Sequence, residues 1–241
     1  MKYIIGCSGF HYKHWRGGFY PENLPARKWF GFYCEHFATL ELNVTFYRFP
    51  KLSTLQEWYR QSPDGFIFSA KVPRSITHFK KLNNTSGMVS DFYGLLQDGL
   101  QEKLGGVLFQ FPPNFSFTED HLQRIIDSVD PSFENVAEFR HRSWWNTDAI
   151  EKLGRHQIAY CGMSHPDFPT DVIGNTSHLY YRMHGYDQLY ASGFSQMELT
   201  SILNKVQMMK DIERAYIYFN NDINGFATQN AERLIKLTID T

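Results

Sequence analysis

Residues 39–46 of the chain have the sequence Thr39-Leu40-Glu41-Leu42-Asn43-Val44-Thr45-Phe46. Apolar side chains occupy every second position, and polar side chains fill the positions between them. Because side chains of a β-strand alternate between its two faces, this pattern predicts a strand over 39–45. Its apolar face, Leu40, Leu42, Val44 and Phe46, would lie under helices. Its other face would point Glu41, Asn43 and Thr45 into the space that the sheet encloses.

Segments of strand and helix character alternate along the rest of the chain. Seven further strands are expected at 3–8, 66–71, 106–111, 136–140, 158–162, 179–184 and 216–220. Helices are expected at 27–36, 54–61, 89–104, 119–128, 147–156, 195–210 and 224–237, with N-caps at Ser53, Thr118 and Ser195. The gap from 164 to 177 predicts a loop or a very short helix. Eight strands alternating with helices predict one domain over 1–241, a single (β/α)8 TIM barrel. An open doubly wound sheet is the alternative, but no Gly-x-Gly-x-x-Gly follows the first strand.

Composition narrows the classes of function. Lys and Arg number 24 and Asp and Glu 25, a formal net charge of -1, which argues against coating nucleic acid or an anionic membrane through bulk charge. No uncharged apolar run approaches the roughly 20 residues of a membrane helix, and residues 1–10 are typical of a first strand. We therefore expect a cytoplasmic protein. The three cysteines, Cys7, Cys34 and Cys161, are widely spaced and predict neither a disulfide framework nor a structural zinc site.

Polar side chains gather on the inward faces of the predicted strands. The same alternation turns inward Lys71, Gln110, Glu138, Arg140, Tyr180, Arg182, His184, Tyr216, Tyr218 and Asn220. Most of them stand near the C-terminal ends of their strands, where barrel enzymes place their chemistry. One such charge can belong to a structural ion pair, but desolvation makes so many buried polar groups an expensive way to fill a core. The set therefore predicts a ligand or catalytic site.

Aromatic and basic residues alternate in the loops that follow these strands. Residues 73–87 carry Arg74, His78, Lys80 and Lys81 around Phe79. Flat rings beside cations suit stacking on a base or sugar, with charge contacts to phosphate or carboxylate. The alternative is that the rings pack the loops onto the barrel rim. Packing is favoured for Trp15, Phe19 and Tyr20, whereas the two interpretations are equal for Trp144 and Trp145.

Several longer motifs run in order along nearly the whole chain. They are Gly6-Cys7-Ser8-Gly9, Trp15-Arg16-Gly17, Phe19-Tyr20-Pro21, Glu41-Leu42-Asn43-Val44-Thr45-Phe46-Tyr47, Lys71-Val72-Pro73, Ile76-Thr77-His78, Leu108-Phe109-Gln110-Phe111-Pro112-Pro113, Glu138-Phe139-Arg140-His141, Arg182-Met183-His184-Gly185 and Tyr218-Phe219-Asn220-Asn221-Asp222. Together they resemble the YecE-like family, also known as domain of unknown function 72. The resemblance implies a (β/α)8 barrel and no established reaction. Its members are similar in fold to endonuclease IV and to xylose-isomerase-type barrels, an analogy that does not fix function.

The favoured interpretation is a metal-independent enzyme of the hydrolase or lyase class. It would act without a cofactor on a small anionic molecule, phosphorylated or acidic and sugar-like, because three fixed cations face two carboxylates at the mouth. The predicted catalytic residues are Glu41, Glu138, Lys71 and His184. The predicted substrate-binding residues are Asn43, His78, Gln110, Arg140, Trp144, Arg182, Tyr218 and Asn220.

Two other interpretations use the same residues. A metal-dependent phosphodiesterase or isomerase, similar to endonuclease IV, would use Glu41, Glu138 and His184 as ligands, with His78 or Asp222, but Lys71 and the arginines would repel a divalent ion. A non-catalytic binder of nucleotide or nucleic acid would use the aromatic and basic loops, and the near-neutral net charge disfavours a nucleic acid as partner. No membrane partner is expected.

Overall fold

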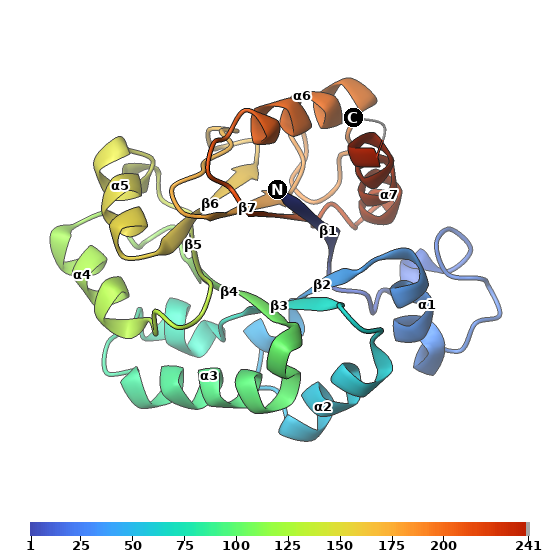
Figure 1. The fold of residues 1–241 in the computed structure, drawn as a ribbon, viewed down its shortest axis with the longest axis horizontal. Helices are drawn as coiled ribbons and strands as arrows, with labels where there is room; N and C mark the ends of the chain where they lie inside the picture. The colour runs from blue at the N-terminus through green and yellow to red at the C-terminus, as the bar shows by residue number, and fades with distance from the viewer. Residues whose placement is uncertain (240–241) are drawn as a thin grey trace.

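Eight parallel strands close into one barrel, each hydrogen-bonded to the next and the last to the first (Figure 1). The computed structural model describes residues 1–239. The strands are β1 (Lys2–Ser8), β2 (Thr39–Leu42), β3 (Ile67–Lys71), β4 (Leu104–Phe111), β5 (Asn135–Phe139), β6 (Ile158–Ser164), β7 (His178–Met183) and β8 (Arg214–Phe219). The predicted TIM barrel is therefore confirmed, and the open sheet is excluded.

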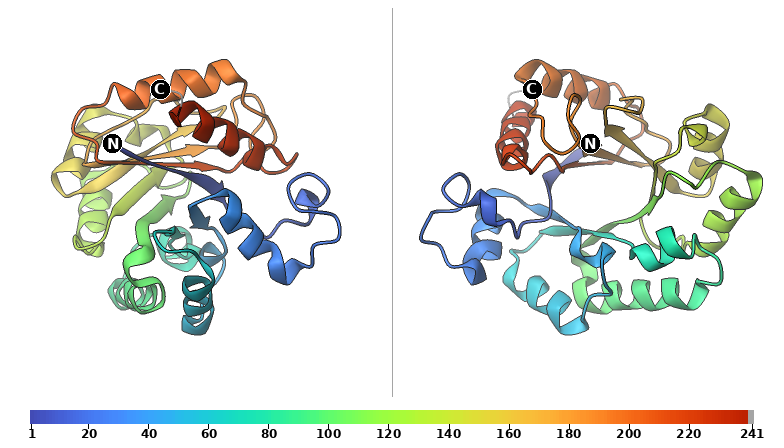
Figure 2. Two further views of the ribbon diagram at one scale, coloured as in Figure 1. Left: turned by 45° about the vertical axis from the view of Figure 1, so that its right-hand side comes forward. Right: turned by 180° about the vertical axis from the view of Figure 1, so that it is seen from behind.

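Helices surround the barrel on its outside (Figure 2). They are α1 (Trp29–His36), α2 (Leu52–Gln61), α3 (Ser86–Leu100), α4 (Glu119–Ser128), α5 (Thr147–Arg155), α6 (Gln196–Gln207) and α7 (Phe226–Ile239). Within residues 1–239, the segment between β6 and β7 contains no helix, as the Pro- and Gly-containing gap predicts. None of the helices in this part of the chain has both the length and the apolar character needed to span a membrane.

Capping side chains fix two helix starts where the sequence predicts them. Thr118 accepts a hydrogen bond from the His121 backbone N–H, and Ser195 forms a reciprocal capping box with Glu198. The prediction of Ser53 as a cap was wrong, because α2 already begins at Leu52 with Lys51 before it.

The second strand is shorter than its alternating pattern predicts. It ends at Leu42, and a 3-10 turn, η3 (Val44–Phe46), follows. Thr45 fixes this turn by donating to the backbone oxygens of Leu42 and Lys71, at 2.7 and 2.6 Å. Leu40 and Leu42 are buried as predicted, but Val44 is exposed and Phe46 lies at the barrel mouth. The alternation of apolar residues continues beyond the strand and conceals the turn.

Large side chains fill the barrel interior below the mouth. The interior cluster consists of Ile4, Leu108, Val136, Ala159, Cys161, Tyr180, Tyr216 and Tyr218. A Cβ on Gly106 would stand 2.8 Å from the Tyr180 ring, so glycine is required there. The Tyr218 hydroxyl lies 2.6 Å from the Thr39 hydroxyl and 2.9 Å from that of Ser69. The barrel interior below the mouth is therefore a packed core.

Candidate active site

The C-terminal ends of β2 to β8 bring together most of the predicted site residues. The side chains of Glu41, Lys71, Gln110, Glu138, Arg140, Arg182, His184 and Asn220 are all buried at this end of the barrel. Arg140, His184 and Asn220 lie one residue beyond their strands, at the rim. The inward sorting of these residues, made from strand periodicity, thus matches the structure.

Arg182 is the centre of a closed ionic network. Its Nη2 donates to Oε1 of Glu41 at 2.6 Å, and its Nη1 donates to Oε2 of Glu138 at 2.7 Å. The Tyr180 hydroxyl donates to Oε2 of Glu41 at 2.7 Å, and the Ser8 hydroxyl donates to Oε1. One guanidinium thus separates the two carboxylates, and every oxygen of Glu41 has a donor.

Arg140 completes the network on the other side of Glu138. Its Nε and Nη2 lie 2.7 and 2.6 Å from Oε1 of Glu138. Burial alone would raise the pKa of Glu138, but the guanidinium groups of Arg140 and Arg182 outweigh burial and hold that pKa well below its usual range. Glu138 is therefore a permanent anion whose two oxygens are both engaged by arginines.

His184 is neutral in this network. Its Nε2 lies 2.8 Å from Nη2 of Arg140, which can only donate, so Nε2 must accept. Its Nδ1 lies 3.2 Å from the side-chain amide of Asn220. Burial, and then the charge of Arg140, hold the pKa of His184 well below its usual range. The lone pair that a base would use is thus already directed at Arg140.

Lys71 differs from these residues because its ammonium group has no polar partner. Its side chain is 6% exposed. Its Nζ lies 4.0 Å from the centroid of the Phe46 ring, and among residues 1–239 it forms neither a hydrogen bond nor an ion pair. Burial, and then the positive charge of Arg182, lower the pKa of Lys71 to about 7. Lys71 can therefore gain or lose a proton near neutral pH.

The other side of the Lys71 environment is formed by the segment after β3. A π-helical turn, η4 (Ser75–Phe79), carries His78, whose ring lies 4.9 Å from that of Phe46. Burial, and then the charge of Lys71, lower the pKa of His78 to about 4, so His78 is neutral at physiological pH. Turns of this kind occur frequently at functional sites.

Asn43 and Gln110, two uncharged residues of the predicted site, also carry side-chain polar atoms without partners among the described residues. The buried Oδ1 of Asn43 has no hydrogen-bond partner in the described part of the chain. The amide of Gln110, on the strand that pairs with β3, is likewise unbonded to any of residues 1–239. Buried polar groups normally have partners, so these two unpaired side chains are candidates to bond a ligand.

Two predicted binding residues lie away from this place. Trp144 is buried in the outer layer, stacked 3.9 Å from Phe139, and its Nε1 donates to the Phe115 carbonyl at 2.8 Å. Tyr218 lies in the barrel interior, as described above. Trp15 and Tyr20 are both buried, so these rings of the first loop pack against the barrel as predicted.

Three residues of the site were not predicted: Ser8, Tyr180 as a partner of Glu41, and Phe46. Ser8 ends β1 on the same face as Gly6 and the interior residue Ile4, so strand alternation could have identified it. Phe46 could not be found in this way because alternation assigns it to the opposite face.

The metal-dependent interpretation needs a cluster of ligand side chains, and the described residues do not form one. Among residues 1–239, no three His, Cys, Asp or Glu side chains converge as a metal site would require. Glu41 and Glu138, the ligands that the metal-dependent interpretation uses, direct their oxygens at arginines instead.

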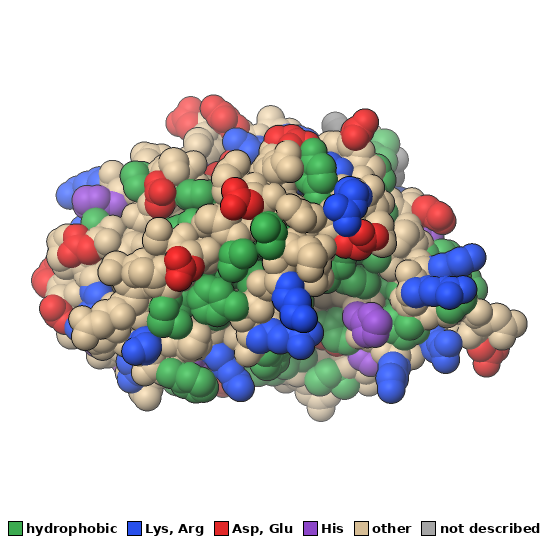
Figure 3. Space-filling model, turned by 90° about the horizontal axis from the view of Figure 1, so that it is seen from below, with side chains coloured by type: hydrophobic (Ala, Val, Ile, Leu, Met, Phe, Trp, Pro, Cys, Tyr) green, Lys and Arg blue, Asp and Glu red, His purple; other side chains and the backbone are tan. Residues whose placement is uncertain are grey.

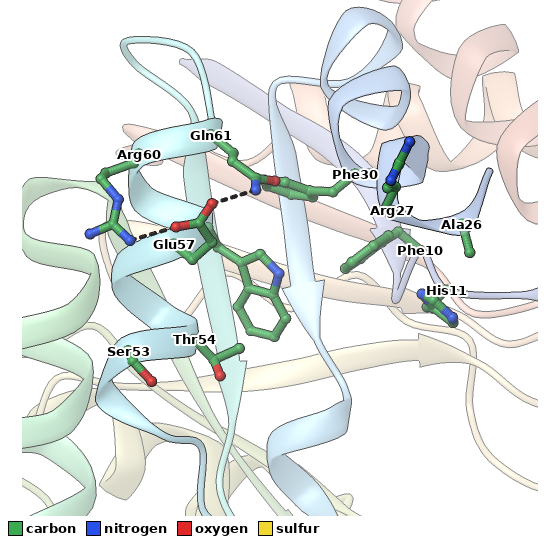
Figure 4. A pocket seen from close by; sticks show the side chains of 11 residues that line it. Phe10, His11, Ala26, Arg27, Phe30, Ser53, Thr54, Glu57, Arg60 and Gln61 are labelled. Carbon is green, nitrogen blue, oxygen red and sulfur yellow. Dashed lines mark hydrogen bonds and ion pairs between the residues drawn. The ribbon is translucent and has the colours of Figure 1, made fainter. Parts of the chain in front are cut away.

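A hollow lies on the outer surface between α1 and α2, away from the barrel mouth. Its volume is about 620 Å³, and Phe10, Arg27, Phe30 and Glu57 are among the residues that line it. Basic side chains and a histidine surround a hollow on this face in Figure 3. Figure 4 shows the carboxylate of Glu57 bonded to Arg60 and Gln61, so the acidic group in this groove is already paired. None of the predicted site residues lines it.

Comparison with known proteins identifies the family. The model of the family described as "Protein of unknown function DUF72" matches residues 4–240. The chain belongs to the DUF72 family. Among proteins similar to this DUF72 member is the UPF0759 protein YunF of Bacillus subtilis (strain 168), 25% identical, with 90% of this chain and 89% of YunF covered.

Solved DUF72 structures share the same barrel. A DUF72 family protein from Thermotoga maritima MSB8 is 27% identical, with a TM-score of 0.90, covering 99% of this chain and all of the other. Another, from Enterococcus faecalis V583, is 18% identical with a TM-score of 0.84, covering 98% and 95% of the two chains, and shows the fold alone. These likenesses support the family and the fold, and they name no substrate.

Proposed function

We propose that this protein is a metal-independent enzyme that acts on a small phosphorylated or acidic sugar-like molecule at the C-terminal mouth of its barrel. The observation that carries this proposal is Lys71, a buried amine without a polar partner and with a pKa of about 7. Such a group is well placed for proton transfer, because general acid–base catalysis is most efficient when the pKa is near the working pH.

An anion at this mouth would be held from two sides. Protonated Lys71 would supply one charge, and Arg140, at the rim, would supply N–H groups not used by Glu138 and His184. Gln110 and the Oδ1 of Asn43 would bond hydroxyl or ester groups of the substrate. In molecules whose Lys71 is neutral, Arg140 would hold the anion, and the Lys71 amine would act as the base of a hydrolase or lyase reaction by accepting the proton that the attacking water or the substrate carbon loses.

The roles of the two carboxylates change in this proposal. Glu41 and Glu138 hold Arg182 and Arg140 in place and keep the mouth near charge balance, so they act as positioning residues. Exchange of a proton at either carboxylate would first require its arginine partners to withdraw.

The experiment is calorimetric titration of the full chain with ribose 5-phosphate. We expect binding by the wild type, and we expect Lys71→Met to weaken it about 10- to 100-fold, as for loss of one charged hydrogen bond. Gln110→Leu should weaken binding about tenfold or less. The matched control is Lys103→Met, a second buried lysine outside the mouth, which should leave affinity unchanged. Equal binding by wild type and Lys71→Met would contradict the proposal.

The pH dependence of anion binding gives a second readout. An anion favours protonated Lys71, so affinity should fall as pH rises above about 7, because binding must then take up a proton. Inorganic sulfate is the suitable probe because its charge is constant across this range. Affinity that is constant from about pH 6 to about pH 9 would contradict the role of Lys71.

A further inference from the structure

Two large aromatic side chains remain exposed at the rim beside Lys71. Phe79, at the end of η4, is 72% exposed, and Tyr47, directly after η3, is 62% exposed. They come from the two segments that follow β3 and β2, the strands that carry Lys71 and Glu41. A pair of exposed rings at one mouth is a more specific feature than single exposed apolar residues, which are common.

An arginine lies against both rings. The guanidinium carbon of Arg74 is 5.6 Å from the centroid of Tyr47 and 5.4 Å from that of Phe79. Arg74 is itself exposed and, within residues 1–239, has no ion-pair partner. We refer to Tyr47, Arg74 and Phe79 as the rim platform. It combines two ring faces with a cation, the combination that binds flat bases beside phosphates.

The rim platform is continuous with the candidate active site. The Tyr47 ring packs edge-on against Phe46, with centroids 5.3 Å apart. The same Phe46 ring contacts Lys71 Nζ at 4.0 Å and His78 at 4.9 Å. One aromatic residue, Phe46, thus contacts both the Tyr47 ring of the platform and the free amine of Lys71.

The backbone beyond the platform is held in an unfavourable conformation. Lys81, Leu82 and Asn84 adopt positive φ angles of 47°, 61° and 50°. This conformation costs free energy for residues other than glycine, and such segments concentrate at binding and active sites. Here the strained segment begins two residues after Phe79, and the Leu82 N–H donates to the Ile76 carbonyl within η4.

We propose that the rim platform binds the flat base of a nucleoside phosphate whose phosphate group lies at Lys71 and Arg140. The position of the phosphate at Lys71 and Arg140 rests on the proposed function. The position of the base rests on the rim platform alone. A single nucleotide is favoured over a nucleic-acid strand because a formal net charge of -1 gives little bulk attraction to a polyanion.

The test is a comparison of three probes by calorimetry on the full chain: adenosine 5′-monophosphate, ribose 5-phosphate and adenosine. Stacking of one base should make the monophosphate bind about 5- to 100-fold more tightly than ribose 5-phosphate. The double variant Tyr47→Ser, Phe79→Ser should reduce this ratio to about 1 while leaving ribose 5-phosphate affinity unchanged. Both residues are exposed, so we expect the variant to fold.

The control is Met197→Ser, which removes an apolar side chain that is 83% exposed on α6 and should keep the ratio. Equal affinity of the wild type for the monophosphate and ribose 5-phosphate would overturn the inference, as would a ratio that survives in the double variant. Concentration-dependent dimers that the double variant abolishes would also overturn it, by making the platform an interface between copies. Binding of adenosine that depends on the platform, without binding of ribose 5-phosphate, would support the platform and contradict the proposed function.

Discussion

Two buried lysines lie at opposite ends of this barrel and differ in one respect. Lys71 ends β3 at the mouth, and Lys103 immediately precedes β4 at the other end. Their side chains are 6% and 5% exposed, and each ammonium lies over an aromatic ring, at 4.0 Å from Phe46 and 4.6 Å from Tyr59. Burial and ring contact therefore do not distinguish them.

Hydrogen bonding distinguishes them. Lys103 donates to the Tyr59 and Ser62 carbonyls, at 2.9 and 2.8 Å, and to the Ser62 hydroxyl at 2.9 Å. Lys71 has no such acceptor within residues 1–239. A buried ammonium with three acceptors stabilises the contact between the segments that it joins. One without acceptors lowers the stability of the fold, and its N–H donors remain free for a ligand. The opposite ends of a TIM barrel divide in this way between stability and function.

The largest expected effect concerns the anion that faces Lys71 across the mouth. Glu138→Gln should lower the free energy of unfolding by about 3–5 kcal/mol, because it leaves Arg140 buried without a counter-charge and Arg182 with Glu41 as its remaining carboxylate partner. Urea unfolding of wild type and variant measures the difference. The folded-state pKa of Glu138 is depressed, so the difference should be complete above about pH 4.3 and should shrink as pH falls through the folded pKa. A variant as stable as wild type at neutral pH would show that the network does not hold the mouth.

The next effect tests the structural lysine. Lys103→Met should destabilise the fold by about 1–3 kcal/mol, because two backbone carbonyls lose their buried donor. Chemical denaturation measures this loss, and ribose 5-phosphate affinity should not change. Lower affinity at unchanged stability would reverse the roles assigned to the two lysines.

The smallest expected effect is a gain in the free energy of unfolding instead of a loss. Lys71→Met should raise the free energy of unfolding by about 0.5–2 kcal/mol, because it removes a buried charge that has no partner. In the unfolded chain this lysine holds its proton up to about pH 10.4, and in the folded protein only up to about pH 7. Between these values the unfolded state binds more protons, so wild-type stability rises with pH relative to the variant. The gain from Lys71→Met should therefore be greatest below pH 7 and disappear towards pH 10. A loss of stability at pH 6 would mean that Lys71 is a structural residue.

Sequence periodicity predicted the barrel and the inward faces because strand alternation is a local property. It placed Glu41, Glu138 and Arg182 in the lumen for this reason. It did not predict that Arg182 stands between the two carboxylates, because that depends on how β2, β5 and β7 meet across the barrel. The 3-10 turn at Val44–Phe46 was missed because apolar alternation continues through it. The structural role of Lys103 was not predicted, because the sequence pattern places it inside the helix expected at 89–104. In the structure α3 ends at Leu100, and Lys103 lies in the connection to β4.

The proposed role of Lys71 depends on its ionisation near neutral pH, and this ionisation can be measured directly. Nuclear magnetic resonance of lysine side chains labelled with ¹³C at Cε gives the titration of each amine, and Lys71→Met assigns the signal. We predict a Lys71 midpoint at a pH of about 7, well below the value of about 10.4 for a lysine in an unfolded chain. A Lys71 midpoint near 10 would contradict the account, because the amine would then be permanently charged and could not exchange protons at neutral pH.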